Sequence, residues 1–265
     1  MERDYWVRQT HGTPLFPELE WARPENKNQA GKLLIIGGNQ HGFAAPAEAY
    51  AVATQAGIGT ARVLLPNALQ KTVGRVLENG EFAASTPSGS FSQKALDELL
   101  LHANWADAVL LAGDLGRNSE TAILLQKFLA KSPLPVTLTK DAVDYVTSAP
   151  RIALDRPNSL LVLSLSQLQR LGVAAKFPRP ISFSMDLLHL VEWLHEFTHL
   201  YKISIIVKHL DTLVVATSGQ VSSTKLQQEK QLWRIQTAAK SSVWWLQNPA
   251  TPFKALTAAQ GSAHA

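Results

Sequence analysis

The sequence contains no cysteine among its 265 residues. This absence excludes a disulfide framework, a cysteine zinc site and a thiol nucleophile. Long hydrophobic runs are also missing, and none approaches the ~20 apolar residues that a membrane helix needs. The first residues include Glu2 and Asp4, where a signal peptide would place basic residues and then an apolar stretch. We therefore expect a soluble, cytoplasmic protein with no membrane partner.

Charge of one sign is scarce as well. The formal net charge is only +4, although the isoelectric point is near 9.3. Basic residues are scattered rather than grouped, so the sequence predicts no nucleic-acid partner. Hydrophobic residues make up 46% of the chain and charged residues 17%. These proportions exclude a mainly disordered protein and allow a sizeable core.

Short apolar runs that end at glycine or proline alternate with stretches of helical propensity. The runs predict buried strands at residues 33–36, 62–65, 108–111, 135–139, 160–163, 203–207 and 212–216. Helices are predicted over 44–56, 92–104, 119–130, 184–201, 224–247 and 252–259. The alternation predicts an α/β fold with a mostly parallel central sheet flanked by helices, and the short step before the last strand predicts a hairpin. Ligands of such sheets bind beyond the carboxyl ends of the strands.

The chain divides into three predicted parts. Residues 1–30 contain several prolines and lack periodicity, which predicts an irregular N-terminal arm. Residues 31–260 carry the alternating pattern and form the predicted domain. Residues 261–265, which follow the last predicted helix, are expected to be a loose tail.

Several motifs occur in a particular order. They are GKLLIIGGN at 31–39, AAP at 44–46, AGIG at 56–59, AD at 106–107, GDLG at 113–116, TKDAV at 139–143, and Lys208 with Thr212. In this order and spacing they resemble the ADP/ATP-dependent NAD(P)H-hydrate dehydratases, which have the ribokinase-like fold. The resemblance spans about residues 23 to 217.

The resemblance implies a site and its ligands. Family enzymes phosphorylate the ring hydroxyl of a hydrated nicotinamide cofactor with ADP or ATP, and loss of phosphate restores NADH or NADPH. It implies ADP or ATP and NAD(P)H hydrate as ligands, a nucleotide-type partner and a homo-oligomer. The cofactor-binding residues that it implies are Gly37, Gly38, Asn39, Ala45, Gly116, Asp141, Lys208 and Thr212.

One family motif is absent. The family carries a Gly-Gly-x-Gly-Asp segment whose backbone amides cradle phosphate and whose aspartate acts as the base. This chain has no aspartate after Asp211 and no glycine between Gly219 and Gly261. Glu229 is the last acidic residue of that segment. We therefore assign no catalytic residue and predict a catalytically impaired or inactive nucleotide-binding homologue. The alternative is an active dehydratase with an unexpected base.

A second departure concerns the turn at 113–116. Asp114 stands where the family has a glycine, so a carboxylate enters a turn that would face phosphate or cofactor. Like charge weakens anion binding there. The individual residues also have plainer explanations: Gly37 and Gly38 suit a strand-ending turn, Lys208 suits a surface position, and Asp141 suits a helix start.

A third hypothesis comes from the segment HEFTH at 195–199. Two histidines one helical turn apart with a following glutamate, the H-E-x-x-H pattern, bind zinc in many hydrolases. Here His195, Glu196 and His199 lie on the side of the predicted helix opposite its apolar stripe. A third ligand at the usual spacing is missing, so we expect a solvated face and predict no metal site.

Three tryptophans mark the C-terminal helical region: Trp233, Trp244 and Trp245. They suit either an oligomer interface or core packing against the sheet, and we favour the core.

Overall fold

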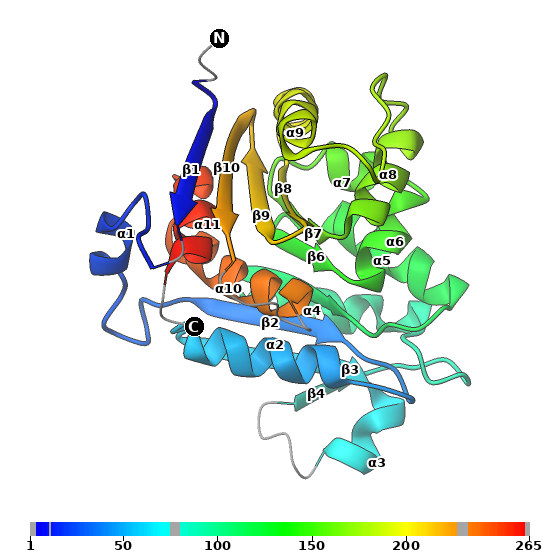
Figure 1. Cartoon of the computed structure of the whole chain (residues 1–265). Helices are drawn as coiled ribbons and strands as arrows, with labels where there is room; N and C mark the ends of the chain where they lie inside the picture. Colours follow the sequence, from blue (N-terminus) through cyan, green and yellow to red (C-terminus); the bar gives the residue numbers. More distant parts are fainter. Residues whose placement is uncertain (1–3, 11, 75–79, 227–232, 263–265) are drawn as a thin grey trace.

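The fold is described from a computed structural model, in which residues 4–10, 12–74, 80–226 and 233–262 are placed. Within them a ten-stranded sheet has the order β1-β10-β9-β8-β7-β6-β5-β2-β3-β4 (Figure 1). The strands are β1 (Trp6–Thr10), β2 (Lys32–Gly37), β3 (Thr60–Pro66), β4 (Gly80–Ala83), β5 (Ala108–Gly113), β6 (Val136–Thr139), β7 (Ser159–Leu163), β8 (Ser204–His209), β9 (Thr212–Thr217) and β10 (Gln220–Lys225). Neighbouring strands are parallel, except that β9 runs antiparallel to both β8 and β10.

Helices cover both faces of the sheet. One face carries α4 (Leu96–Trp105), α5 (Ser119–Lys131), α6 (Asp141–Thr147), α7 (Arg151–Leu154), α8 (Leu165–Ala174) and α9 (Leu187–Tyr201). The other face carries α2 (Ala44–Gln55), α10 (Trp233–Gln247) and α11 (Pro252–Gly261). The short helices α1 (Glu18–Trp21) and α3 (Gln70–Val73), with two 3-10 helices at Asn67–Leu69 and Gln93–Ala95, complete the described set. This layered arrangement buries both sides of the parallel strands.

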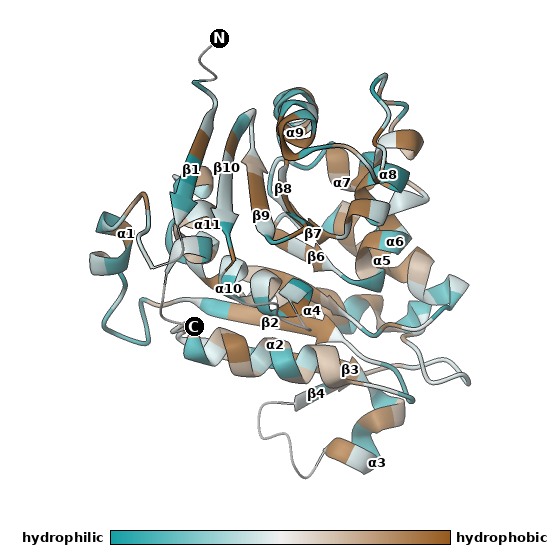
Figure 2. Cartoon of the chain, in the orientation of Figure 1, coloured by the Kyte–Doolittle hydropathy of each residue, from teal (hydrophilic) through white to brown (hydrophobic). Residues whose placement is uncertain are grey.

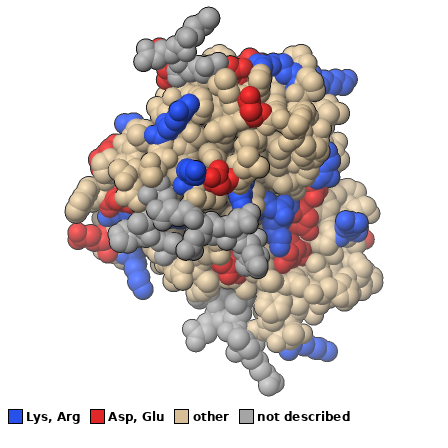
Figure 3. All heavy atoms as spheres, in the orientation of Figure 1, with Lys and Arg blue, Asp and Glu red and all other residues tan. Residues whose placement is uncertain are grey.

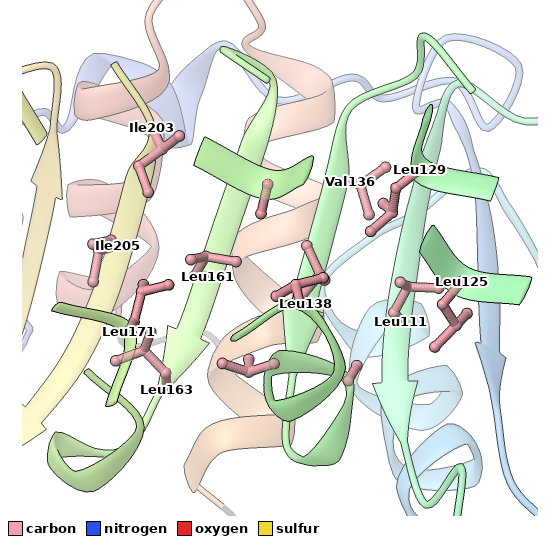
Figure 4. Close-up of a cluster of buried hydrophobic side chains, with 14 of the residues drawn as sticks. Leu111, Leu125, Leu129, Val136, Leu138, Leu161, Leu163, Leu171, Ile203 and Ile205 are labelled. Carbon is pink, nitrogen blue, oxygen red and sulfur yellow. The ribbon is translucent and has the colours of Figure 1, made fainter. Parts of the chain in front are cut away.

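Strand β2 shows why the sequence forms this sheet. Successive side chains of a strand point to opposite faces. Leu34 and Ile36 therefore join the core under α4 and α5, whereas Leu33 and Ile35 join the core under α2 and α10. Figure 4 shows the first of these cores, in which leucines of β5, β6 and β7 meet leucines of α5 and α8. Figure 2 shows that the inner strands are mainly apolar, whereas the helices carry polar bands.

The structure confirms the α/β fold and every predicted strand, with small shifts at the ends. The predicted hairpin joins β8 to β9, where Thr212 pairs with His209. No helix in the described part of the chain is long and apolar enough to cross a membrane.

The expectation of an irregular arm over residues 1–30 is wrong in part. Strand β1 pairs with β10 in parallel and extends the sheet, and α1 follows it. The side chain of Gln9 is 6% exposed and donates to Thr224 Oγ1 at 2.9 Å and to the carbonyl of Thr257 at 2.7 Å. Such buried side-chain bonds are set by tertiary partners and leave no periodicity in the sequence.

The C-terminal expectations also need correction. Residues 224–247 do not form one helix, because Thr224 and Lys225 belong to β10 and α10 begins at Trp233. The predicted loose tail is wrong at its start, since Gly261 ends α11 and is buried. Residues 263–265 lie outside the described residues.

The three tryptophans pack inward, as the core alternative predicts. Trp244 and Trp245 are 1% and 6% exposed. Trp245 and the half-buried Trp233 pack into the core beneath α2, whereas Trp244 packs between α10 and α11. Trp244 and Trp245 are thus buried within one chain, although Nε1 of Trp244 has no hydrogen-bond partner among the described residues.

Candidate functional site

The carboxyl ends of β2, β5 and β6 lie side by side in the sheet. Because parallel strands end at the same edge, the turns that follow them converge there. The starts of α2 and α6 come directly after two of these turns. Free amides at helix starts favour negative charge. This edge is therefore the place at which the fold can hold an anionic ligand.

The turn after β5 has an unusual backbone. Gly113, Asp114 and Gly116 have φ values of 97°, 57° and 78°. Glycine adopts positive φ without strain, and aspartate tolerates it better than most residues. Asn39, in the turn after β2, donates from Nδ2 to the carbonyl oxygen of Asp114 at 2.6 Å. This hydrogen bond joins the turn after β2 to the turn after β5.

The Asp114 carboxylate joins two other elements. Its Oδ2 accepts from the backbone N–H of Ala45, in the first turn of α2, at 2.8 Å. Its Oδ1 lies 2.5 Å from Nζ of Lys140, the residue that follows β6. The side chains of Asp114 and Lys140 are 20% and 30% exposed. A half-buried pair of this kind is screened less than a surface pair.

The backbone carbonyl of Lys140 is held by the side chain of Gln167, in the first turn of α8. Gln167 donates from Nε2 to the carbonyl of Lys140 at 2.7 Å and to Oδ1 of Asp144 at 3.0 Å. Its Oε1 accepts from Nη1 of Arg234 at 3.2 Å. Gln167 is 3% exposed and also completes the capping box at the start of α8 with Ser164. One buried amide therefore ties α6, α8 and the start of α10 together.

Asp141 is the other carboxylate of this edge. Its Oδ2 accepts from the N–H of Leu115 at 2.9 Å. Its Oδ1 is buried and has no hydrogen-bond partner within the described residues. Burial raises the pKa of Asp141, the Leu115 hydrogen bond opposes that rise, and the negative charge of Asp114 adds to it. The neutral form is therefore easier to reach here than in water.

Most of the predicted cofactor-binding residues meet at this edge. They are Gly37 at the end of β2, Gly38 and Asn39 in its turn, Ala45 at the start of α2, Gly116 after β5, and Asp141 at the start of α6. Lys208 and Thr212 lie on the β8–β9 hairpin, which ends at the same edge but two strands beyond β6. The binding role of each residue stays a prediction.

The plainer explanation of the glycines also has structural support. A side chain at Gly37 would meet the carbonyl oxygen of Gly113 at 2.5 Å, and Gly38 has φ of 86°. Gly37 thus needs glycine for the close approach of β2 and β5, and Gly38 needs it for its positive φ, whether or not a ligand binds.

Sequence reasoning missed Gln167 and Arg234 as parts of this edge. Ser164 and Gln167 have the spacing of a capping box, so the sequence did signal a helix start there. Nothing in the sequence shows that the Gln167 amide also reaches Lys140 and Arg234. The side chain of Tyr145, which donates to the carbonyl of Gly116 and accepts from the N–H of Asn118, was missed for the same reason.

The segment expected to lack the phosphate cradle is only partly described. Residues 220–225 form β10, and residues 227–232, with Glu229, lie outside the described part. Arg234 contacts Gln167, so the start of α10 lies at the carboxyl edge of the sheet. Figure 3 shows one face of the molecule, on which acidic and basic side chains lie close together.

The H-E-x-x-H helix has other partners. The ring of His195 stacks on Tyr5 at 3.7 Å between centroids, and its Nδ1 bonds to the carbonyl of Gly219. Glu196 pairs with Arg179 at 2.5 Å. The described residues include no group of three or more histidine, aspartate or glutamate side chains that could hold a metal. His195 is thus partly covered by Tyr5, which precedes β1, and by the turn at Gly219, whereas Glu196 and His199 are exposed as expected.

Comparison with known proteins places these features in context. No family model matches the chain. A bifunctional NAD(P)H-hydrate repair enzyme of Methanothermobacter thermautotrophicus is 31% identical over 121 residues, which are 44% of this chain and 23% of that enzyme. Its counterpart in Methanocaldococcus jannaschii is 32% identical over 126 residues, 46% of this chain and 24% of that enzyme. The chain thus aligns with about a quarter of each of these curated relatives.

Solved structures resemble the whole fold. A ribokinase-like superfamily protein of Enterococcus faecalis has a TM-score of 0.70 at 14% identity, over 98% of this chain and 86% of that one. The ADP/ATP-dependent NAD(P)H-hydrate dehydratase of Bacillus subtilis, co-crystallised with ATP and Mg²⁺, has a TM-score of 0.60 at 13% identity, over 93% and 86%. The chain has a ribokinase-like fold and sequence similarity to NAD(P)H-hydrate repair enzymes, which confirms the resemblance.

Proposed function

We propose that this chain is an NAD(P)H-hydrate dehydratase-like protein that binds a nucleotide at the carboxyl edge of its sheet and has lost most or all of the phosphoryl-transfer chemistry. The observation that carries the binding part is the meeting of Asn39, the start of α2 and Asp141 at the ends of β2, β5 and β6. The similarity to repair enzymes and the ribokinase-like fold support the ligand class. ADP or ATP and NAD(P)H hydrate are the proposed ligands.

The loss of chemistry rests on residue types. Phosphoryl transfer needs donors that cradle phosphate and a carboxylate that takes the hydroxyl proton. The chain has neither glycine nor aspartate from 220 to 260. The carboxylate of Asp114 is engaged by Lys140 and Ala45. Loss of a general base alone typically removes ~10² to 10⁴ in rate.

A second candidate is an active dehydratase with a substitute base. Asp141 favours it, because its Oδ1 is buried without a partner in the described residues and burial raises its pKa. A carboxylate with a raised pKa is a stronger base than an ordinary one. Asp141 would then accept the hydroxyl proton that the missing aspartate accepts in the family.

Assembly and location complete the proposal. We infer a homo-oligomer in the cytoplasm from the resemblance to the family, with no nucleic-acid or membrane partner.

Thermal unfolding with ATP, ADP, AMP, NADH and NADPH tests the proposed binding. A ligand at about 100 times its dissociation constant should stabilise the chain by ~2.7 kcal/mol. Asn39→Ala should reduce this gain, since it releases the turn after β5. Asn158→Ala is the matched control, because Asn158 is exposed and precedes β7 at the opposite edge. No stabilisation by any of the nucleotides would contradict the proposal.

A further inference from the structure

The carboxylate of Asp114 uses the groups that an anionic ligand would use at this edge. It accepts a hydrogen bond from the backbone N–H of Ala45, one of the free amides at the start of α2, and it pairs with the ammonium of Lys140. We propose that Asp114 is a specificity-determining residue, a carboxylate of the chain that excludes phosphate from the ends of β2, β5 and β6. This inference rests on the proposed function, because it concerns the same site.

The contact between Asp114 and Lys140 requires an unfavourable backbone conformation at both residues. Asp114 has φ of 57° and Lys140 has φ of 53°, so both partners of the pair have positive φ. Residues other than glycine rarely adopt such backbone, and they keep it where surrounding contacts hold it. Here Asn39 holds the carbonyl of Asp114, and Gln167 holds the carbonyl of Lys140.

The side chain of Lys140 crosses the turn after β5, so its ammonium could contact a ligand there. A side chain at Gly113 would meet Cβ of Lys140 at 2.7 Å and Oδ1 of Asp141 at 2.9 Å. The lysine therefore lies against the backbone of the turn after β5, with its ammonium beside the start of α2. An ammonium next to a free helix amide is a favourable partner for phosphate. With Asp114 present, both donors are already used by a carboxylate.

Charge then decides which part of a nucleotide this subsite takes. A phosphate at the Lys140 ammonium would meet the Asp114 carboxylate at short range, and like charges this close repel strongly away from bulk water. Asp141 adds a second acidic group beside the turn. The subsite therefore suits an uncharged donor group, such as an amide or a hydroxyl of the ligand, and disfavours its phosphates.

The experiment compares inorganic phosphate binding to three variants and the unmodified chain. Asp114→Gly removes the carboxylate and suits the positive φ. Asp155→Asn removes the same charge at the end of α7, where exposed Asp155 pairs with Arg151. Asp114→Gly combined with Lys140→Gln removes the ammonium as well. The readout is the unfolding midpoint as the phosphate concentration rises.

Asp114→Gly should reach a given rise in the unfolding midpoint at a phosphate concentration at least about tenfold lower than the unmodified chain needs. Asp155→Asn should stay within about threefold of the unmodified chain, and the double variant should lose the gain. An equal response of Asp114→Gly and the unmodified chain, or an equal gain in Asp155→Asn, would overturn the inference. The proposed function fails separately, if the unmodified chain binds none of the nucleotides tested.

Discussion

The side-chain amide of Gln167 donates to the backbone carbonyl of Lys140 at 2.7 Å, while its oxygen accepts from Arg234 at 3.2 Å. One residue at the start of α8 thereby fixes the turn after β6 and the first turn of α10. Both elements border the carboxyl edge at which the proposed ligand binds.

Replacing Gln167 by alanine should destabilise the protein. The change removes the Gln167 bond to the carbonyl of Lys140, which keeps only a longer bond of 3.3 Å from the N–H of Val143 within the described residues, and it removes the reciprocal cap with Ser164. We expect a loss of about 2–3 kcal/mol in the free energy of unfolding, measured by urea denaturation. Gln126→Ala is the control, because within the described residues the hydrogen bond of the Gln126 side chain is a long one, 3.5 Å to Ser148 at the surface. Losses of equal size in the two variants would contradict the role given to Gln167.

Asp141 should make stability depend on pH. Its pKa is raised in the folded protein relative to the usual value of 3.8, so the folded state keeps a proton that the unfolded state has lost. The contribution of Asp141 to stability should therefore be greatest below about pH 4, and it should fall as the pH rises through the folded pKa. Asp141→Asn should remove this fall, because an amide does not titrate.

The measurement for Asp141 is the difference between the unfolding free energies of the two proteins across pH. Exposed Asp186 and Asp211 have lowered pKa values and act in the opposite direction. Both remain in the variant, so their effect cancels in the difference. A difference that does not change with pH would refute the raised pKa of Asp141.

Gly261→Ala should destabilise the packing of the N-terminal strand. An added Cβ would lie 2.5 Å from Cδ of Gln9, whose amide is bonded on both sides. We expect a loss of roughly 1–3 kcal/mol from this overpacking. Gly42→Ala is the matched control, because a Cβ at Gly42 meets nothing within 4 Å. Unchanged stability in both variants would show that Gln9 and Gly261 are not packed as described.

The sequence predicts the centre of the sheet well and its ends poorly. Runs such as 33–36 and 160–163 are apolar on both faces because both faces are covered, and that pattern is local. Strand β10 instead buries Ser222, Ser223 and Thr224. Its polar residues carry no apolar alternation, since their hydroxyls are satisfied by contacts such as that of Ser222 with Thr257.

The candidate site shows the same division. Gly37, Gly38 and Asn39 follow a recognisable strand, so their place at the carboxyl edge could be predicted. The sequence also placed Asp114 in the turn after β5. It could not show the pairing of Asp114 with Lys140, because that contact joins two turns that are 26 residues apart and requires positive φ at both.

The rate at which the chain restores NADPH from hydrated NADPH with ADP or ATP tests the central claim most directly. The Bacillus subtilis dehydratase, assayed under the same conditions, is the reference. We predict a rate lower than the reference by at least ~10², as expected when a general base is lost. A rate equal to that of the reference enzyme would contradict the claim that the phosphoryl-transfer chemistry is lost.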